Sequence, residues 1–176
     1  MKRLSIFGAA AIAASVVIAT SAFAQSYLNA ASKARGDFGT SSASRSLNSA
    51  RGYAQDFSRY AQSAPKVEKE VAMETADAIG EYITKAKKHF AWMRANAEKA
   101  KDKETLASLD AIDKNLAAAE KTHKGMMEMC MKDTIDPAEC TKCCHQIDES
   151  LAKAIDEHDK LMKKLGMTNP TPTGKK

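Results

Sequence analysis

The chain contains 176 residues, of which 27 are basic and 22 are acidic, so its formal net charge at pH 7 is +5. An excess this small is typical of an ordinary solvated surface and gives no support to a nucleic-acid-binding protein, so we expect no nucleic-acid partner. The length is sufficient for one domain with its own hydrophobic core.

The N-terminus predicts export. It begins Met-Lys-Arg, continues with an apolar stretch from Leu4 to Thr20, and ends in small residues at Ala22 and Ala24. This pattern is typical of a secretory signal peptide, so we predict one over residues 1–24, with cleavage after Ala24. A membrane anchor is disfavoured because the apolar stretch is shorter than the roughly 20 residues that span a bilayer. We therefore expect a periplasmic or secreted protein without a transmembrane segment after cleavage.

Three further segments are predicted from composition. Residues 25–42 are rich in Ser, Ala, Gly and Asn and lack sustained apolar periodicity, which predicts a flexible arm. Residues 43–166 are predicted to form a helical-bundle domain, and residues 167–176, which include two prolines, a disordered tail. Within the domain, a short amphipathic helix is predicted from Ser44 onward. Its arginines and tyrosines also suit an adhesive arm for an anionic partner, but packing of its aromatic edge on the bundle is preferred.

Three long helices follow, each marked by boundary signals. Pro65 suits the start of the first, which runs to about Lys101, and Asp102 is the predicted N-cap of the second. The third begins with a capping box, in which Asp136 is the N-cap, and it ends at Gly166. Apolar residues recur along all three at spacings of three and four, as in a coiled coil. We predict an all-α fold: an antiparallel bundle of three long helices plus a shorter N-terminal helix.

The stretch from His123 to His145 concentrates the reactive side chains, because it holds all four cysteines, two of the four histidines and four of the nine methionines. By contrast, His158 lies on the seam of the last helix and is predicted to be a packed core residue. Glycine inside a helix costs about 1 kcal/mol relative to alanine. Gly80 and Gly125 therefore predict a close approach between backbones, or space for a bulky group, beside this stretch.

Helical register predicts which of these side chains meet. In two antiparallel helices joined by a tight turn near Thr134, facing residues have numbers that sum to about 269. Cys130 is then opposite Cys140, and Met126 is level with Cys144. The same layers are predicted to contain His123, while Cys143 points about 100° away from Cys144 on its helix.

The first hypothesis for the cysteines is a disulfide staple, because an exported protein meets an oxidising compartment. Adjacent Cys143 and Cys144 seldom join each other. The remaining alternatives are Cys130–Cys144 with Cys140–Cys143, Cys130–Cys143 with Cys140–Cys144, or a single Cys130–Cys140 bond. A bond between the two helices closes a loop of about a dozen residues, which is worth roughly 3 kcal/mol.

The second hypothesis is a soft-metal site. Thiolate, thioether and imidazole ligands together suit Cu(I) first and Zn(II) second. The predicted ligands are Cys130, Cys140 and Cys144, with His123 or Met126 as a further ligand. Apart from copper or zinc, no cofactor is expected.

A third hypothesis, covalent haem, is disfavoured because attachment requires C-x-x-C-H. Here Cys140 and Cys143 are followed by Cys144 before His145, so the motif is one residue too long. The sequence contains no Gly-rich phosphate loop and no Ser-His-Asp grouping, and we predict a protein that is not an enzyme. The predicted role is a structural or partner-binding module, with a helix-mediated partner or self-association.

Three sequence patterns carry a resemblance to known proteins. The pattern H-x2-M-x3-C from His123, the D-P-x2-C-x2-C-C pattern from Asp136, and the A-S-R-S-L-N-S-A-R segment from Ala43 resemble an uncharacterised group of secreted bacterial helical proteins. The likeness covers about residues 43–166 and implies a helical bundle with a Cys/His-bearing hairpin, without an activity. The cysteines also look distantly similar to those of copper-storage four-helix bundles, although four cysteines at one end of the core depart from that pattern.

Overall fold

The computed structural model describes residues 10–167, with side chains from Gly36 onward, and the regular secondary structure of this part consists of helices alone. Its four helices are α1 (Ala10–Ser63), α2 (Lys69–Ala100), α3 (Lys103–Cys130) and α4 (Pro137–Lys164). This confirms the predicted all-α class. None of the described helices is long and apolar enough to cross a membrane. The first nine residues of the predicted signal peptide, and the predicted tail from residue 168, lie outside the described residues.

α1 has 54 residues and is the longest of the four helices. It includes residues 25–42, for which the sequence predicted a flexible arm, and the shorter helix predicted from Ser44. Contacts divide the chain into two units, residues 1–37 and residues 38–176.

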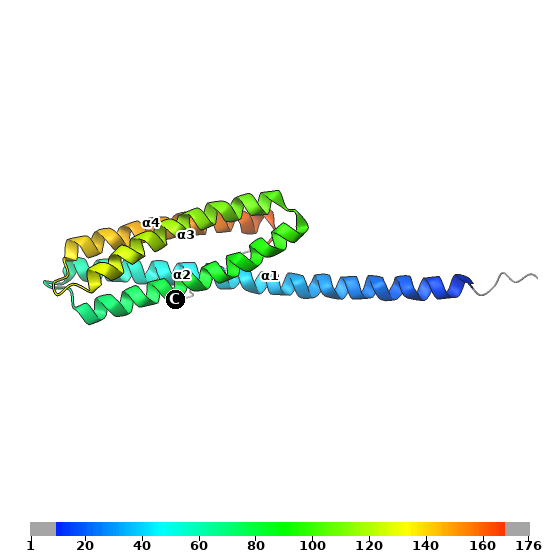
Figure 1. Ribbon diagram of the computed structural model, residues 1–176, viewed down its shortest axis with the longest axis horizontal. Coiled ribbons are helices and arrows are strands. Elements are labelled where there is room, and N and C mark those ends of the chain that lie inside the picture. Colours follow the sequence, from blue (N-terminus) through cyan, green and yellow to red (C-terminus); the bar gives the residue numbers. More distant parts are fainter. Residues whose placement is uncertain (1–9, 168–176) are drawn as a thin grey trace, which may run out of the picture. The chain divides into compact units, whose positions relative to one another are not determined.

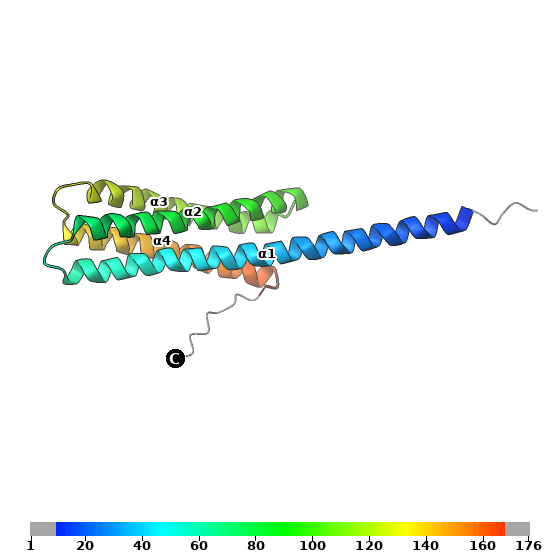
Figure 2. The same cartoon turned by 90° about the horizontal axis from the view of Figure 1, so that it is seen from below.

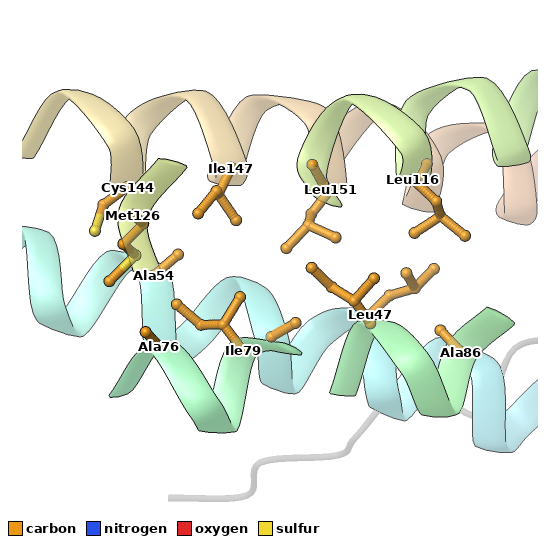
Figure 3. Packing of buried hydrophobic residues seen from close by; sticks show 14 of the residues in the cluster. Leu47, Ala54, Ala76, Ile79, Ala86, Leu116, Met126, Cys144, Ile147 and Leu151 are labelled. Carbon is orange, nitrogen blue, oxygen red and sulfur yellow. The ribbon is translucent and has the colours of Figure 1, made fainter. Parts of the chain in front are cut away.

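From Phe38 onward, α1 packs with α2, α3 and α4 in a helical bundle (Figures 1 and 2). The apolar seams predicted for the long helices form its core, part of which is shown in Figure 3. The largest fully buried side chains come from all four helices: Leu47, Ile79, Ile83, Phe90, Leu109, Ile112, Leu116, Met126, Ile147, Leu151, His158 and Leu161. Burial of these side chains, at about 25 cal/mol per Å² of apolar surface, is the main force that holds the helices together.

The helix starts follow the capping signals of the sequence. The Asp102 carboxylate accepts a hydrogen bond from the Thr105 backbone N–H at 3.0 Å, which confirms it as the N-cap of α3. The Asp136 carboxylate accepts one from the Ala138 N–H at 2.9 Å, with Pro137 at the first helical position of α4. Such caps satisfy backbone donors that have no partner within the helix. They fix where α4 begins and so determine which of its cysteines face the core.

Polar contacts tie neighbouring helices along the bundle surface. Between α1 and α4, the Asp148 carboxylate lies 2.7 Å from Arg51 Nε and 2.8 Å from Gln55 Nε2. Between α2 and α3, Arg94 lies 2.7 Å from Asp110 and 2.8 Å from Asp113. Such partly exposed pairs contribute at most about 1 kcal/mol each, so they favour one register of the helices rather than drive folding.

Candidate functional site

The four cysteines form the candidate site, and we refer to them as the thiol cluster. Cys130 is the last residue of α3, and Cys140, Cys143 and Cys144 lie in the first two turns of α4. All four are free thiols in this structure. Three of them have no exposed surface, and only Cys143 is partly exposed. The short α3–α4 connection thus brings thiols from two helices into one end of the core.

The difference in exposure follows from helical geometry. Because α4 begins at Pro137, Cys140 and Cys144 are four residues apart on the face that meets the core. Cys143 precedes Cys144 by one residue and so points about 100° away from it. The buried and partly exposed positions agree with the register predicted from the sequence.

The environment of the cluster favours protonated thiols. Burial, followed by the neighbouring cysteines, raises the pKa of Cys140 to about 12 and that of Cys144 to about 12. Burial and then Cys143 raise the pKa of Cys130. Burial and Glu139 raise the pKa of Cys143, while Lys142 acts in the opposite direction. A thiol of raised pKa is a weak nucleophile at neutral pH, so the cluster lacks the electropositive setting of a catalytic cysteine.

Two methionines extend the cluster with further sulfur atoms. Cys140 Sγ lies 4.0 Å from Met129 Sδ, and Met129 is buried. The predicted neighbour Met126 is fully buried, and Figure 3 shows it among the packed core side chains at the same end as Cys144. Sequence reasoning missed Met129, although its number and that of Cys140 satisfy the same register rule that selected Cys130.

His123 has a different partner from the one predicted. Its Nε2 atom lies 2.7 Å from the carbonyl oxygen of Ala76 on α2, so the imidazole joins α3 to the backbone of α2. A Cβ atom added at Gly80 would lie 2.7 Å from Cε1 of this imidazole, which explains why α2 has a glycine there. Of the two predicted reasons for Gly80, space for a bulky group is the one that the structure shows, because the imidazole occupies it. At Gly125 a Cβ would meet no atom within 4 Å, so neither reason applies there.

The predicted ligand set is not assembled as a metal site in the described residues. Among them, no three or more histidine, cysteine or acidic side chains converge in an arrangement that could hold a metal ion. Cys130, Cys140 and Cys144 are brought into one end of the core, whereas His123 bonds to a backbone carbonyl. Sulfur is therefore the predominant donor that the cluster offers.

Surface hollows lie beside the cluster between α1 and α4. One cavity of about 440 Å³ is lined by residues that include Arg59, Cys144, His145 and Asp148. A neighbouring one of about 630 Å³ is lined by the first turns of α4 and the last turn of α1, again with His145. His145 itself is exposed. Of the two hollows, the smaller one reaches the cluster at Cys144.

His158 is the other buried titratable side chain of the core, as the sequence predicted. It has no exposed surface, its ring edge meets Phe90 with centroids 5.6 Å apart, and neither ring nitrogen has a hydrogen-bond partner in the described part. The Asp159 carboxylate is 3.7 Å from Nδ1, which is too long for a hydrogen bond. Burial lowers the pKa of His158. No group of three or more possible metal ligands includes it in the described residues, so we treat it as a core residue.

Comparisons with protein-family models, with curated proteins and with solved structures found no match to this chain.

Proposed function

We propose that this protein is an exported, non-enzymatic helical bundle in which a disulfide within the thiol cluster staples α3 to α4, and that it serves as a structural or partner-binding module. The observation that carries the proposal is the burial of Cys130 on α3 with Cys140 and Cys144 on α4, at the junction of the two helices. A disulfide that includes Cys130 has at least one sulfur fully buried in the core, which slows its reduction and suits a structural bond.

The proposal includes an antiparallel path for the three long helices. Two contacts between α2 and α3 support it: Lys87 lies 2.7 Å from Glu120, and Arg94 lies 2.8 Å from Asp113. The later residue of α2 meets the earlier residue of α3. In such a path a staple joins the two ends of one tight connection, so it restrains the hairpin without distorting the rest of the bundle.

Peptide mapping tests the staple directly. Trypsin cleaves after Lys124, Lys132, Lys142 and Lys153, and so separates peptide 125–132 with Cys130, peptide 133–142 with Cys140, and peptide 143–153 with the adjacent pair. We expect protein purified without reductant to yield peptide 125–132 joined to one of the other two. Recovery of peptide 125–132 only with a free thiol, from protein exported by its own leader, would contradict the staple.

Export itself is supported by the signal-peptide pattern of residues 1–24. Intact-mass measurement of protein from the cell-envelope and medium fractions should give a chain that begins at Gln25. A mass that retains residues 1–24 would instead indicate an anchored protein.

Soft-metal binding is the second candidate, and one distance favours it. Cys140 Sγ and Met129 Sδ are 4.0 Å apart, within the span of two metal–sulfur bonds of about 2.3 Å each. Cu(I) is the preferred ion because thiolate and thioether are soft ligands, and Zn(II) is second. In this candidate Met129 joins Cys130, Cys140 and Cys144, and Met126 is a further sulfur ligand.

A competition titration separates the two candidates. Reduced protein is titrated with Cu(I) against a chelator, and Met129→Leu and Cys130→Ser are compared with Met73→Leu, a matched thioether loss on α2. Tight binding that both site variants weaken, and the control keeps, would favour the metal site. Binding no tighter than that of the urea-unfolded chain would leave the staple.

A further inference from the structure

The four thiols differ in access, and this difference bears on how a disulfide forms. Cys130, Cys140 and Cys144 have no exposed surface, whereas Cys143 is partly exposed on α4. Thiol–disulfide exchange requires a thiolate to approach the external disulfide in line with its S–S bond. In the folded protein, an external disulfide therefore meets Cys143 before any other member of the cluster.

A resolving thiol lies on the other helix. Cys130 ends α3 at the junction and is the only one of the four cysteines that does not lie on α4. Cys143 and Cys140 are three residues apart on one helix, so a bond between them would join no second element. The pair that joins α3 to α4 through the accessible thiol is therefore Cys130 with Cys143.

We propose that Cys143 is the thiol at which the disulfide of another molecule first reacts with this protein, and that buried Cys130 resolves the mixed disulfide to give a Cys130–Cys143 bond between α3 and α4. This inference rests on the proposed staple and specifies its chemistry. In the first step the Cys143 thiolate attacks the external disulfide RSSR, which forms Cys143–S–SR and releases one RS⁻. In the second, the Cys130 thiolate attacks Cys143 Sγ and releases the other RS⁻. Two protein thiols are oxidised and one external disulfide is reduced to two thiols.

Glutathione disulfide is the probe for this reaction. Reduced mature protein is mixed with an excess of it, quenched with acid at intervals, and weighed intact. We expect a single glutathione adduct to appear first and then to decay into a species two hydrogens lighter than the reduced protein. In Cys130→Ser the adduct should persist, and fragmentation of peptide 143–153 should place it on Cys143.

A matched pair of variants at adjacent residues isolates the accessible thiol. Cys143→Ser should form the adduct at least about tenfold more slowly, because the remaining thiols are buried and weakly ionised. Cys144→Ser should react at the wild-type rate. Cys144 lines the 440 Å³ cavity, so this variant tests whether the external disulfide reacts at Cys144 through that cavity instead. Serine at either position is close in size to cysteine, and circular dichroism checks that both variants fold. Urea-unfolded protein should lose the difference between the two.

The outcomes separate this inference from the proposed function. A staple that forms in Cys143→Ser at the wild-type rate would overturn the inference and leave the staple standing. Wild-type protein that accumulates a stable adduct on Cys143, but never links peptide 125–132 to α4, would support Cys143 as the first-reacting thiol and overturn both the resolving role of Cys130 and the staple. Slow reaction in Cys144→Ser with normal reaction in Cys143→Ser would move the site to the cavity between α1 and α4.

Discussion

The thiol cluster and His158 are buried in the same core, but within the described residues the cluster has neighbours with which it can form bonds and His158 does not. Each sulfur of the cluster has other sulfurs or cysteines nearby, and one of them, Cys143, is partly exposed. His158 faces the edge of Phe90, and neither of its ring nitrogens has a hydrogen-bond partner in the described part. Buried groups that can combine with one another offer a bond or a ligand set, whereas a single buried imidazole carries only the cost of desolvation. The comparison shows that neighbours, not burial, distinguish a candidate site from a core residue.

The largest effect is expected at the cluster. Formation of a disulfide between α3 and α4 should stabilise the protein by roughly 3 kcal/mol, because it closes a loop of about a dozen residues in the unfolded chain. Urea unfolding of oxidised and reduced protein measures the difference, and Cys130→Ser serves as a control that should show no dependence on reductant. If oxidised and reduced wild type unfold at the same urea concentration, no stabilising disulfide joins the two helices, and the cysteines contribute only their packing.

The next effect concerns the two glycines near the cluster. Gly80→Ala places a Cβ 2.7 Å from the His123 ring, which must move away from the Ala76 carbonyl. Gly125→Ala meets nothing within 4 Å and gains helix propensity. We expect Gly80→Ala to be less stable than Gly125→Ala by about 2 kcal/mol, from the lost hydrogen bond and the strain of repacking. Thermal unfolding of the two variants side by side checks this, and equal stabilities would mean that His123 is free to leave α2.

His158 should make the protein sensitive to acid. Burial lowers its pKa, so between the ordinary value of 6.5 and the lower folded value the unfolded state binds more protons. The free energy of unfolding is therefore not reduced by protonation of His158 above about pH 6.5, and it decreases as the pH falls toward the folded pKa. His158→Leu should remove this part of the pH dependence and raise stability near neutral pH by about 1–2 kcal/mol, since a buried imidazole without hydrogen bonds is replaced by an apolar group.

Denaturant titrations across pH 4–8 (the interval around the ordinary histidine value) measure this effect. His89→Leu provides the comparison, because burial also lowers the pKa of His89 but its ring is less deeply buried. His89→Leu should therefore change the pH dependence of stability less than His158→Leu does. An unchanged pH profile in His158→Leu would show that the imidazole has a polar partner in solution.

The smallest effects are expected from ion pairs at the bundle surface. Arg51 with Asp148 joins α1 to α4 near the cluster, and Arg94 with Asp113 joins α2 to α3. Both pairs are partly exposed, so double-mutant cycles should give coupling energies below about 1 kcal/mol for each. A clearly larger value for Arg51–Asp148 alone would show that the α1–α4 boundary near Cys144 is held more tightly than the remainder of the bundle.

The fold was largely predictable because its signals are local. Capping residues such as Asp102 and Asp136, proline at the first position of α4, and apolar spacing mark the boundaries and inward faces of the three long helices. Burial of Cys140 and Cys144 together, with Cys143 turned partly outward, also follows from spacing alone. So does burial of His158 on the core face of α4.

Which side chains touch between two helices changes when one helix shifts by a single residue. The tertiary structure alone decided these contacts. Sequence reasoning placed His123 among the metal ligands, but its imidazole bonds to Ala76 over the space that Gly80 leaves open. It selected Cys130 opposite Cys140 and missed Met129, whose sulfur lies 4.0 Å from Cys140. The length of α1 was not predicted, because residues 25–42 lack the apolar periodicity that indicates a helix in a sequence. Periodicity thus determined which faces meet, and the rotation of each side chain within the packed core determined which atoms meet.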